Sequence, residues 1–439
     1  MGDLEHETTE LLQRLLRFNT VNPPGQERAA IEFLAGLLEG AGFDCELLAL
    51  DEARPNLVAR LASGRAGGRA GPVVGFLSHV DTVLADPAAW SRDPWSGDVV
   101  DGELWGRGAI DMKSQTAAEV AAALSLARDG WRPERGELKV MCVVDEEAGG
   151  RYGAQFLTEQ HPDKVRCDVL LNEGGGTVFE YDGRRWYGVC VAEKGVFRFT
   201  VSTDGVAGHA SIPRMGDNAL LKLAPLLDRF ADSQPAYDLT DEPRALLTAL
   251  TGVADGELDP AAAIEALRAK DPFLALIFEP TMGVTATPTR VSASEKINVI
   301  PSVAHIQVDC RVPPGMGEPE TRARIEAMLG DSGYRLEFDE RVVGNRSAMD
   351  APLMDAIRAW VAEHDPGAEV VPTVLPGFTD SRWFRVAFPE VVAYGFFPQK
   401  HMTLHQTAPL IHGADERIDV RDLGFAATFF SDLARELLG

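Results

Sequence analysis

The sequence predicts an α/β protein in which a mixed sheet is covered by helices, with an inserted α+β domain of ferredoxin-like order. The first observation is that short runs rich in Val, Ile and Leu alternate with longer stretches of helical spacing; the runs lie at 56–61, 72–78, 138–144 and 168–172. The second is a change near residue 195 to alternating strands in β-α-β-β-α-β order. The third is the return of the first pattern after residue 345, which makes the first domain discontinuous.

The elements of the first domain follow in order along the chain. Two helices open it, because apolar residues recur at helical spacing in 4–18 and 28–42, on either side of the turn Asn22-Pro23-Pro24-Gly25. Its other helices are predicted at 113–129, 151–160, 351–364 and 421–437, and its late strands at 368–374 and 391–396. We assign residues 1–195 and 346–439 to this domain.

Residues 196–345 form the inserted domain. After the alternating strand GVFRFTVSTDG, its predicted elements are a helix at 218–231, strands at 284–293 and 303–312, a helix at 319–329 and a strand at 334–342. A less regular stretch rich in Ala and acidic residues is expected at 235–280.

Composition excludes several classes of partner and location. The 439 residues include 42 Lys and Arg against 67 Asp and Glu, and the net charge of −25 repels nucleic acid and anionic membranes. No apolar run approaches the roughly 18 residues of a membrane span, and the acidic start lacks the features of a signal peptide. Five scattered cysteines without a CxxC pair predict neither a disulfide framework nor a cysteine zinc site. We therefore expect a cytoplasmic protein with no nucleic acid or membrane partner.

Residue types that bind metals follow several predicted strands. They are His79, Asp81, Asp111, Glu146, Glu147, Glu173 and, late in the chain, His412. Two histidines with carboxylates suit zinc, cobalt or manganese, and a carboxylate can bridge two such ions. His79 and Asp81 point to the same side of an extended segment, so Asp81 can hold the imidazole ring. The alternative is that His79 and Asp81 are ordinary surface residues at a strand end, without a role in metal binding.

The glutamates after the later strands are harder to explain without a cation. Glu146 and Glu147 directly follow the apolar run KVMCVV, where buried carboxylates are costly unless a positive charge compensates them. Their side chains can diverge at a bend, so one can bind metal while the other acts as general base. Glu173 follows another apolar strand and precedes three glycines that permit close backbone approach. The alternatives are a solvated turn for the pair and a plain turn or helix start for Glu173.

Nine segments together carry a resemblance to a known family. They are GFLSHVDTV (75–83), ELWGRGAIDMKSQ (103–115), VVDEEAGG (143–150), LNEGG (171–175), GHAS (208–211), KINVIPS (296–302), DCRVPPG (309–315), GFTDSRWF (377–384) and IHGADERI (411–418). In this order they resemble the M20 metallopeptidases, which include carboxypeptidase G2-like enzymes, aminoacylases, acetylornithine deacetylase and succinyl-diaminopimelate desuccinylase. The resemblance implies a zinc-exopeptidase-like fold with residues 1–195 and 346–439 as catalytic domain and 196–345 as lid and dimerisation domain.

The resemblance also implies a ligand set for two zinc ions per chain, for which cobalt or manganese can substitute. Asp111 would bridge the ions, with His79 and Glu173 on one of them. Glu147 and His412 would bind the other. We choose His412 over the histidines of QKHMTLHQ because its HGADER setting matches the family.

Three catalytic residues are implied as well. Glu146 would be the general base toward a metal-bridged water that attacks the amide carbonyl, and Asp81 would support His79. His209 of GHAS resembles a histidine that reaches the neighbouring subunit's site, which implies a homodimer through the lid domain. Without the resemblance, His209 reads as an ordinary polar residue of a loop.

Four residues are expected to bind substrate. Arg311 can clamp a substrate carboxylate through two parallel hydrogen bonds, and Asn298 can bind the same group or the scissile carbonyl. The alternatives are structural: Arg311 pairing with an acid such as Asp309, and Asn298 fixing a loop. Gly377 and Thr379 resemble the family's substrate-binding loop.

The sequence therefore predicts a metal-dependent hydrolase of an amide or peptide bond next to a free carboxylate, either an exopeptidase or an N-acyl amino acid amidohydrolase. Its partners would be small-molecule or short peptide substrates with a free carboxylate. A non-catalytic ligand-binding relative on the same scaffold is the first alternative, and a purely structural dimer the second. The 235–280 stretch is longer and less regular than the compact members of that family need, which favours the peptidase and aminoacylase branch over the desuccinylases.

Overall fold

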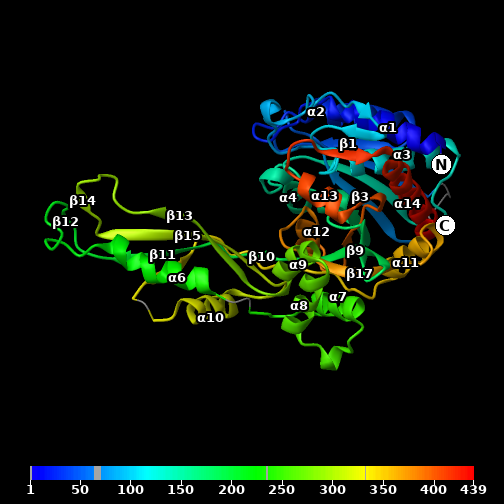
Figure 1. Cartoon of the computed structure of the whole chain (residues 1–439). Helices are drawn as coiled ribbons and strands as arrows, with labels where there is room; N and C mark the ends of the chain where they lie inside the picture. The colour runs from blue at the N-terminus through cyan, green and yellow to red at the C-terminus, as the bar shows by residue number, and fades with distance from the viewer. Residues whose placement is uncertain (1, 64–70, 234–235, 332) are drawn as a thin grey trace. The chain divides into compact units, whose positions relative to one another are not determined.

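The computed structural model describes residues 2–63, 71–233, 236–331 and 333–439 (Figure 1). The chain divides into two compact units, the first formed by Met1–Val191, Ser347–Thr373 and Thr379–Gly439, the second by Ala192–Arg346 and Val374–Phe378. The predicted α/β class with a mixed sheet is confirmed. None of the helices in the described ranges is long and apolar enough to cross a membrane.

A ten-stranded mixed sheet forms the centre of the first unit. Its order is β1-β2-β6-β3-β7-β18-β9-β8-β19, and β17 pairs with β9. The strands are β1 (Asp44–Leu48), β2 (Asn56–Ala62), β3 (Val73–His79), β6 (Glu137–Val143), β7 (Val169–Asn172), β8 (Thr177–Tyr181), β9 (Arg184–Glu193), β17 (Ala368–Leu375), β18 (Val392–Gly395) and β19 (Gln399–Thr403). Because β6, β3, β7 and β18 run parallel, their carboxyl ends meet at one edge of the sheet.

Helices cover both faces of this sheet. Phe76 of β3 makes an edge-to-face contact with Phe430, at 5.0 Å between ring centroids. Leu77, the next residue, points to the opposite face and packs in a core cluster with Phe156 and Phe384. The helices on the Phe76 face are α1 (Gly2–Leu16), α3 (Lys113–Arg128) and α14 (Val420–Leu438), and those on the Leu77 face are α4 (Ala154–Gln160) and α12 (Ser381–Ala387). The helices α1 and α14, far apart in the sequence, therefore lie side by side (Figure 1).

Shorter elements complete the first unit. They are α2 (Arg28–Gly40), α5 (Pro162–Val165), α11 (Pro352–His364), α13 (Leu404–Thr407), the 3-10 turns η1 (Pro87–Ala89), η2 (Glu146–Ala148) and η6 (Ala408–Leu410), and a small sheet of β4 (Val99–Val100), β5 (Glu103–Trp105) and β20 (Arg417–Asp419). The four strands first predicted are present as β2, β3, β6 and β7. The prediction lacks β1 and the hairpin of β8 and β9.

The second unit has an antiparallel sheet packed against helices. Its strands are β10 (Gly195–Val196), β11 (Phe199–Asp204), β13 (Thr285–Ser292), β15 (Val303–Val312) and β16 (Arg335–Phe338), and its packed helices α6 (Ala224–Asp232) and α10 (Glu318–Leu329), with η3 (Ala219–Leu223) before α6. Side chains of β15 alternate between the buried core and the other face, as a sheet covered on one side requires. The sequence order β11-α6-β13-β15-α10-β16 is the one that the sequence predicts. The short pair β12 (Gly208–His209) and β14 (Val299–Ile300) lies outside this sheet.

The stretch expected to be irregular at 235–280 is mostly helical in its described part, and that expectation is wrong. Its elements are α7 (Asp241–Thr251), η4 (Asp255–Glu257), α8 (Pro260–Lys270), α9 (Pro272–Phe278) and η5 (Glu279–Met282). Asp259 and Asp271 cap α8 and α9, each accepting hydrogen bonds from two backbone N–H groups. An aspartate followed by proline at the first helical position is a favourable helix start, and this signal occurs twice here.

Candidate metal centre

All five predicted ligands lie in the first unit, near the carboxyl edge of its parallel strands. His79 ends β3, Glu147 lies in η2 after β6, and Glu173 directly follows β7. Asp111 comes from the loop before α3, and His412 from the loop after η6. The strand ends are brought together because β6, β3 and β7 are parallel neighbours.

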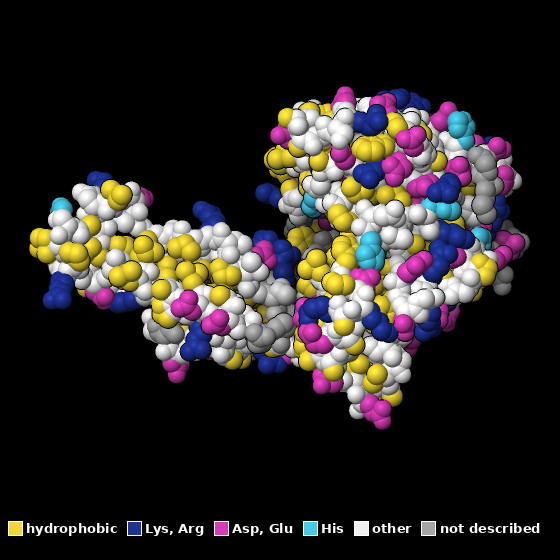
Figure 2. Space-filling model, in the orientation of Figure 1, with side chains coloured by type: hydrophobic (Ala, Val, Ile, Leu, Met, Phe, Trp, Pro, Cys, Tyr) yellow, Lys and Arg dark blue, Asp and Glu magenta, His cyan; other side chains and the backbone are white. Residues whose placement is uncertain are grey.

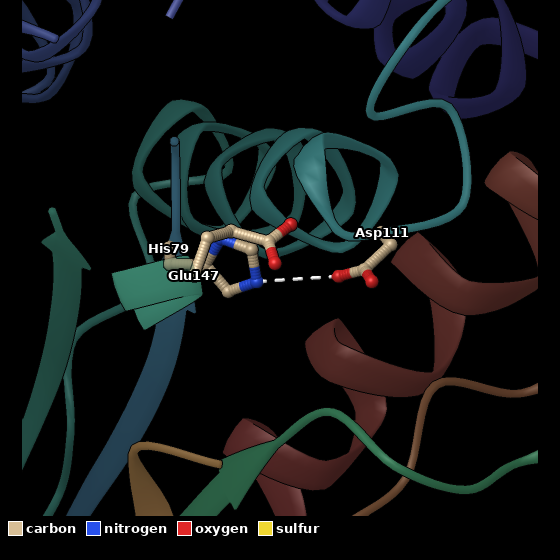
Figure 3. A group of neighbouring side chains, drawn as sticks. All are labelled: His79, Asp111 and Glu147. Atoms are coloured by element: carbon tan, nitrogen blue, oxygen red, sulfur yellow. Dashed lines mark ion pairs between the residues drawn. The ribbon is translucent and has the colours of Figure 1, made fainter. Parts of the chain in front are cut away.

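Asp111 lies between the two histidines. Its Oδ1 atom is 3.3 Å from Nε2 of His79 (Figure 3), and its Oδ2 atom is 3.0 Å from Nε2 of His412. Oε1 of Glu173 is 3.6 Å from Nε2 of His79, and Oε2 of Glu147 is 3.4 Å from Nε2 of His412. One carboxylate thus directs an oxygen toward each of two His–Glu pairs, an arrangement suited to bridging two cations.

The donor atoms of this group fit a metal ion. Ligand atoms of His79, Asp111 and Glu147 lie within 4.8 Å of one another, as do those of His79, Glu146 and Glu173. Among the described residues, the buried Nε2 atom of His79 has no hydrogen-bond partner. Imidazole and carboxylate donors suit zinc, cobalt or manganese, so these residues form a candidate metal centre.

Burial and crowded negative charge dominate the electrostatics of the centre. Burial raises the pKa of Glu146 well above its ordinary value, and the charge of Glu173 raises it further. The pKa of Glu173 is raised to about 7, first by burial and then by the charge of Asp111. Hydrogen bonds to Asp111 and Glu147 raise the pKa of His412 to about 10. The site therefore favours added positive charge, which bound cations would also provide.

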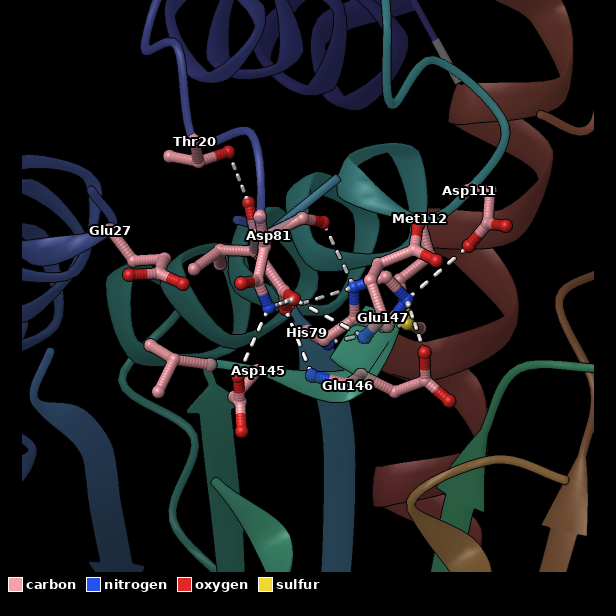
Figure 4. Close-up of polar contacts among 12 residues, drawn as sticks. Thr20, Glu27, His79, Asp81, Asp111, Met112, Asp145, Glu146 and Glu147 are labelled. Atoms are coloured by element: carbon pink, nitrogen blue, oxygen red, sulfur yellow. Dashed lines mark hydrogen bonds and ion pairs between the residues drawn. The ribbon is translucent and has the colours of Figure 1, made fainter. Parts of the chain in front are cut away.

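Asp81 supports the turn that carries both glutamates (Figure 4). Its Oδ1 accepts from the backbone N–H of Glu146 and its Oδ2 from that of Glu147, both at 3.2 Å. Nδ1 of His79 is 3.0 Å from the backbone oxygen of Asp81 and 3.5 Å from its carboxylate. The ring is thus held mainly by the backbone of Asp81, while the carboxylate fixes the glutamate turn.

A second set of buried charges lies behind this turn. Asn22 donates through Nδ2 to Oδ2 of Asp81 at 2.9 Å and to Oδ1 of Asp145 at 3.1 Å. Asp145 has a positive φ of 71° and also accepts from Nη1 of Arg54 at 3.0 Å. Arg54 binds Glu27 through two parallel hydrogen bonds, 3.0 Å from Nε and 2.5 Å from Nη2. None of these supporting residues was predicted from the sequence, although Asp145 directly precedes the glutamate pair.

Four of the remaining predicted residues lie in the second unit. Nδ1 of the exposed His209 is 2.8 Å from the hydroxyl of Ser211. Arg311 binds Asp309 through Nε at 2.7 Å and Nη2 at 3.3 Å, which is the structural pairing considered above. The backbone oxygen of Asn298 accepts from the N–H of Ala210, and its side chain is exposed. A Cβ at Gly377 would meet no atom within 4 Å, so the protein's own packing does not require glycine there.

Thr379 lies in the first unit, behind the metal-ligand group. It is buried, and its hydroxyl accepts a hydrogen bond from Nδ2 of Asn172 at 3.1 Å. The same amide donates to Ser381 at 3.0 Å. Asn172 directly precedes Glu173, so Thr379 contacts the strand end that carries this predicted ligand.

The chain matches one known family and several known proteins over most of its length. The family described as Peptidase family M20/M25/M40 matches residues 75–436. The chain is 28% identical over 417 residues to a succinyl-diaminopimelate desuccinylase of Cereibacter sphaeroides, covering 93% of each protein. It is 26% identical over 439 residues to the succinyl-diaminopimelate desuccinylase of Parvibaculum lavamentivorans, covering 98% of this chain and 95% of the relative.

Solved structures show the same fold. An M20 family metallo-carboxypeptidase from Sulfolobus solfataricus superposes with a TM-score of 0.71 at 17% identity, covering 97% of this chain and 98% of the other. Human carnosine dipeptidase 1 gives a TM-score of 0.68 at 15% identity, covering 98% and 96%. A dinuclear metal-binding peptidase of the same family from Bacillus subtilis gives 0.57 at 14% identity, covering 100% and 99%.

Proposed function

The chain belongs to peptidase family M20/M25/M40 and is a hydrolase, and from this premise we propose that it cleaves an amide or peptide bond next to a free carboxylate. The observation that supports this most is the single carboxylate of Asp111 between two His–Glu pairs. Two cations there would lie beside Glu146, to which we assign the role of base and not of ligand.

We propose zinc as the native metal, two ions per chain, with cobalt or manganese able to substitute. His79 and Glu173 would hold one ion and Glu147 and His412 the other, with Asp111 shared. When bound, such ions polarise a carbonyl and lower the pKa of water toward about 7.

Glu146 would move the protons of the reaction. Its Oε2 atom is 4.0 Å from Nε2 of His79, and its backbone N–H is fixed by Asp81. From there it would take a proton from the attacking water and deliver it to the leaving amine. Asp81 keeps the turn of Glu146 and Glu147 in place while this happens.

The substrate class is an N-acyl amino acid or a short peptide. The curated relatives are named for removal of succinyl groups from diaminopimelate, whereas the solved neighbours include a carboxypeptidase and a dipeptidase. The 235–280 stretch no longer argues against a desuccinylase, because it is an ordered group of helices and the Cereibacter sphaeroides desuccinylase aligns with this chain over 93% of each protein. We therefore give N-succinyl amino acids the first place among substrates to test.

Substrate binding and assembly follow as further parts of the proposal. Arg311, Asn298, Gly377 and Thr379 would bind the substrate, and His209 would act on the site of a neighbouring subunit. Figure 2 shows hydrophobic side chains gathered on the second unit. Exposed apolar residues near His209 in sequence or pairing support a homodimer through the 196–345 domain: Val206, Ile212, Met215, Ile297 and Val299.

We also propose that residues 1–195 and 346–439 act as the catalytic domain and 196–345 as the lid, and that the protein works in the cytoplasm. The free thiols of Cys45, Cys142, Cys167 and Cys310 support a reducing location.

The test combines metal content with a substrate panel. Full-length protein would be assayed on N-succinyl and other N-acyl amino acids and on dipeptides, with added Zn²⁺, Co²⁺ or Mn²⁺. We expect about two metal ions per chain and hydrolysis that Glu146→Ala lowers by at least about 10³-fold with folding intact. Activity that survives this substitution would overturn the proposed role of Glu146. Metal binding without hydrolysis of any substrate would favour the non-catalytic alternative.

A further inference from the structure

Glu416 is a buried carboxylate whose two oxygens are fully used. Oε1 accepts from the backbone N–H groups of Ile110 at 2.7 Å and Asp111 at 2.9 Å. Oε2 accepts from the N–H of Gly108 at 2.9 Å and from Nη1 of Arg107 at 2.7 Å. The side chain therefore binds most of the loop that ends in the shared ligand Asp111.

Arg107 connects the same carboxylate to the loop of His412. It is also buried, and its Nη2 donates to the backbone oxygens of Gly413 at 2.8 Å and His412 at 3.4 Å. A third contact of Nη2, to the backbone oxygen of Leu84 at 3.3 Å, adds the segment that follows β3. One ion pair thus joins the backbones of two ligand-bearing loops that lie about 300 residues apart in the sequence.

His412 needs such support more than His79 does. The side chain of His79 is 1% exposed and follows a central strand, whereas that of His412 is 54% exposed. His412 also has a positive φ of 59°, a backbone conformation that non-glycine residues seldom adopt without local support. Packing around its ring therefore contributes little to the position of His412, and the contacts of its backbone must hold it in place.

We propose that Arg107 and Glu416 are positioning residues that set the distance between Asp111 and His412, and thereby the affinity of the cation held by His412, Glu147 and Asp111. This inference rests on the proposed metal-dependent function. It assigns no contact with substrate to either residue.

The chemistry of the pair explains which substitutions are informative. Glu416→Gln keeps the size of the side chain, but its NH2 group would face two N–H donors in place of an acceptor. Arg107→Lys keeps the buried positive charge but loses the planar fork that reaches Glu416 and the His412 loop together. Each change loosens the tie between the loops without removing a metal ligand.

The neighbouring pair of Arg417 and Glu103 provides a matched control. Arg417 directly follows Glu416 and donates through Nε to Glu103 at 2.9 Å. These side chains are 29% and 33% exposed and join β20 to β5. The side chain of Arg417 also donates through Nη1 to the backbone oxygen of Asp415, and neither bond involves the 108–111 loop or the backbone of His412. Glu103→Gln and Arg417→Lys therefore repeat the chemical changes away from the ligands.

The experiment titrates metal-free full-length protein with Zn²⁺ against a competing chelator. Wild type should bind two equivalents, and Glu416→Gln and Arg107→Lys should weaken one of them by about 10- to 100-fold, a usual cost of losing support for a metal ligand. The other equivalent shares Asp111 but neither His412 nor Glu147, so its affinity should fall less. Activity of both variants at limiting Zn²⁺ should be low and should return with excess Zn²⁺, whereas the two control variants should behave as wild type.

Wild-type affinity of both equivalents in the two variants would overturn the inference, as would equal losses in the control variants. An activity loss that excess Zn²⁺ does not restore would show a merely structural role and would also overturn it. If Glu416→Gln fails to fold, the Zn²⁺ affinities of Arg107→Lys test the inference alone, because this variant retains the buried positive charge. A wild-type protein that binds no Zn²⁺ would instead overturn the proposed function.

Discussion

Two buried Arg–Glu pairs are connected by hydrogen bonds to the candidate metal centre, and they support it in different ways. Glu416 of the first pair accepts a hydrogen bond directly from the backbone N–H of Asp111, a proposed ligand. In the described part of the chain, the hydrogen bonds of Arg54 and Glu27, the second pair, lead to the centre through Asp145 and Asn22, and Asn22 contacts Asp81.

The comparison shows that identical chemistry can serve different properties of one site. A pair that binds a ligand's own backbone fixes the distance between ligands, and its loss should appear as weaker metal binding. A pair that acts through intermediate side chains supports, less directly, the turn that carries the proposed base Glu146 and the proposed ligand Glu147. Its loss should therefore appear mainly in stability and in kcat, with both metal equivalents still bound.

The largest expected effect comes from Arg54→Ala. It leaves the buried carboxyl groups of Glu27 and Asp145 without their cation, and we expect the free energy of unfolding to fall by about 3–5 kcal/mol. Urea unfolding of the metal-free protein measures this. The control is Arg28→Ala, because the pair of Arg28 and Glu32 is exposed. A loss below about 1 kcal/mol for Arg54→Ala would show that the second pair is not needed.

Asn22→Ala tests whether the second pair supports catalysis without being required for metal binding. It removes a donor from both Asp81 and Asp145, and we expect a loss of about 1–3 kcal/mol in stability. The glutamate turn should also loosen, so kcat should fall about tenfold while two Zn²⁺ equivalents still bind. The exposed Asn19, changed to alanine, is the control. Loss of a metal equivalent in Asn22→Ala would remove the distinction between the pairs.

Glu119 is a buried glutamate whose hydrogen-bond partner is an amide and not an arginine, so the effect of its protonation on stability can be tested by changing the pH. Glu119 accepts from Nε2 of Gln115 at 2.8 Å, and burial raises its pKa from 4.5 to about 8. The folded state binds this proton more tightly than the unfolded chain. The free energy of unfolding should therefore decrease as the pH rises from 4.5 to about 8, by up to about 1.4 kcal/mol per pH unit. In Glu119→Gln this pH dependence should be absent.

Unfolding by urea at pH 5, 6.5 and 8 checks the prediction, with wild type and Glu119→Gln compared at each pH. The exposed Glu363 of α11, changed to glutamine, is the control and should keep the wild-type slope. Parallel curves for wild type and Glu119→Gln would show that the carboxyl of Glu119 is not held neutral by folding.

The smallest effect is expected for Glu103→Gln. The pair of Glu103 and Arg417 is partly exposed, so its loss should lower stability by less than about 1 kcal/mol and leave kcat unchanged. Thermal unfolding and a single assay at saturating substrate suffice. A larger loss would mean that partial exposure does not weaken ion pairs in this part of the fold.

The candidate ligands at strand ends, and their convergence at one edge of the sheet, could be predicted from local sequence. His79, the pair of Glu146 and Glu147, and Glu173 each follow an apolar run, and parallel strands bring such ends together. Asp111 and His412 come from loops, where no periodicity places them. They were assigned through the resemblance to the M20 family, which carries tertiary information that a single local pattern lacks.

The supporting charges could not be predicted, because burial of a charged side chain is decided by segments far away in the chain. Nothing near Arg54 shows that Glu27 will lie opposite it, and nothing near Glu416 shows that the 108–111 loop will surround it. The β8–β9 hairpin is different, since Asp182 and Gly183 between two aromatic-rich runs are a hairpin signal that was available.

The contact between α1 and α14 has a consequence for biosynthesis. The helix α14, which completes the layer over Phe76, is synthesised long after α1, and His412 emerges shortly before it. A nascent chain halted before residues 411–438 would therefore expose an unfinished apolar layer. Until these residues have been synthesised, the chain would also lack one of its proposed metal ligands.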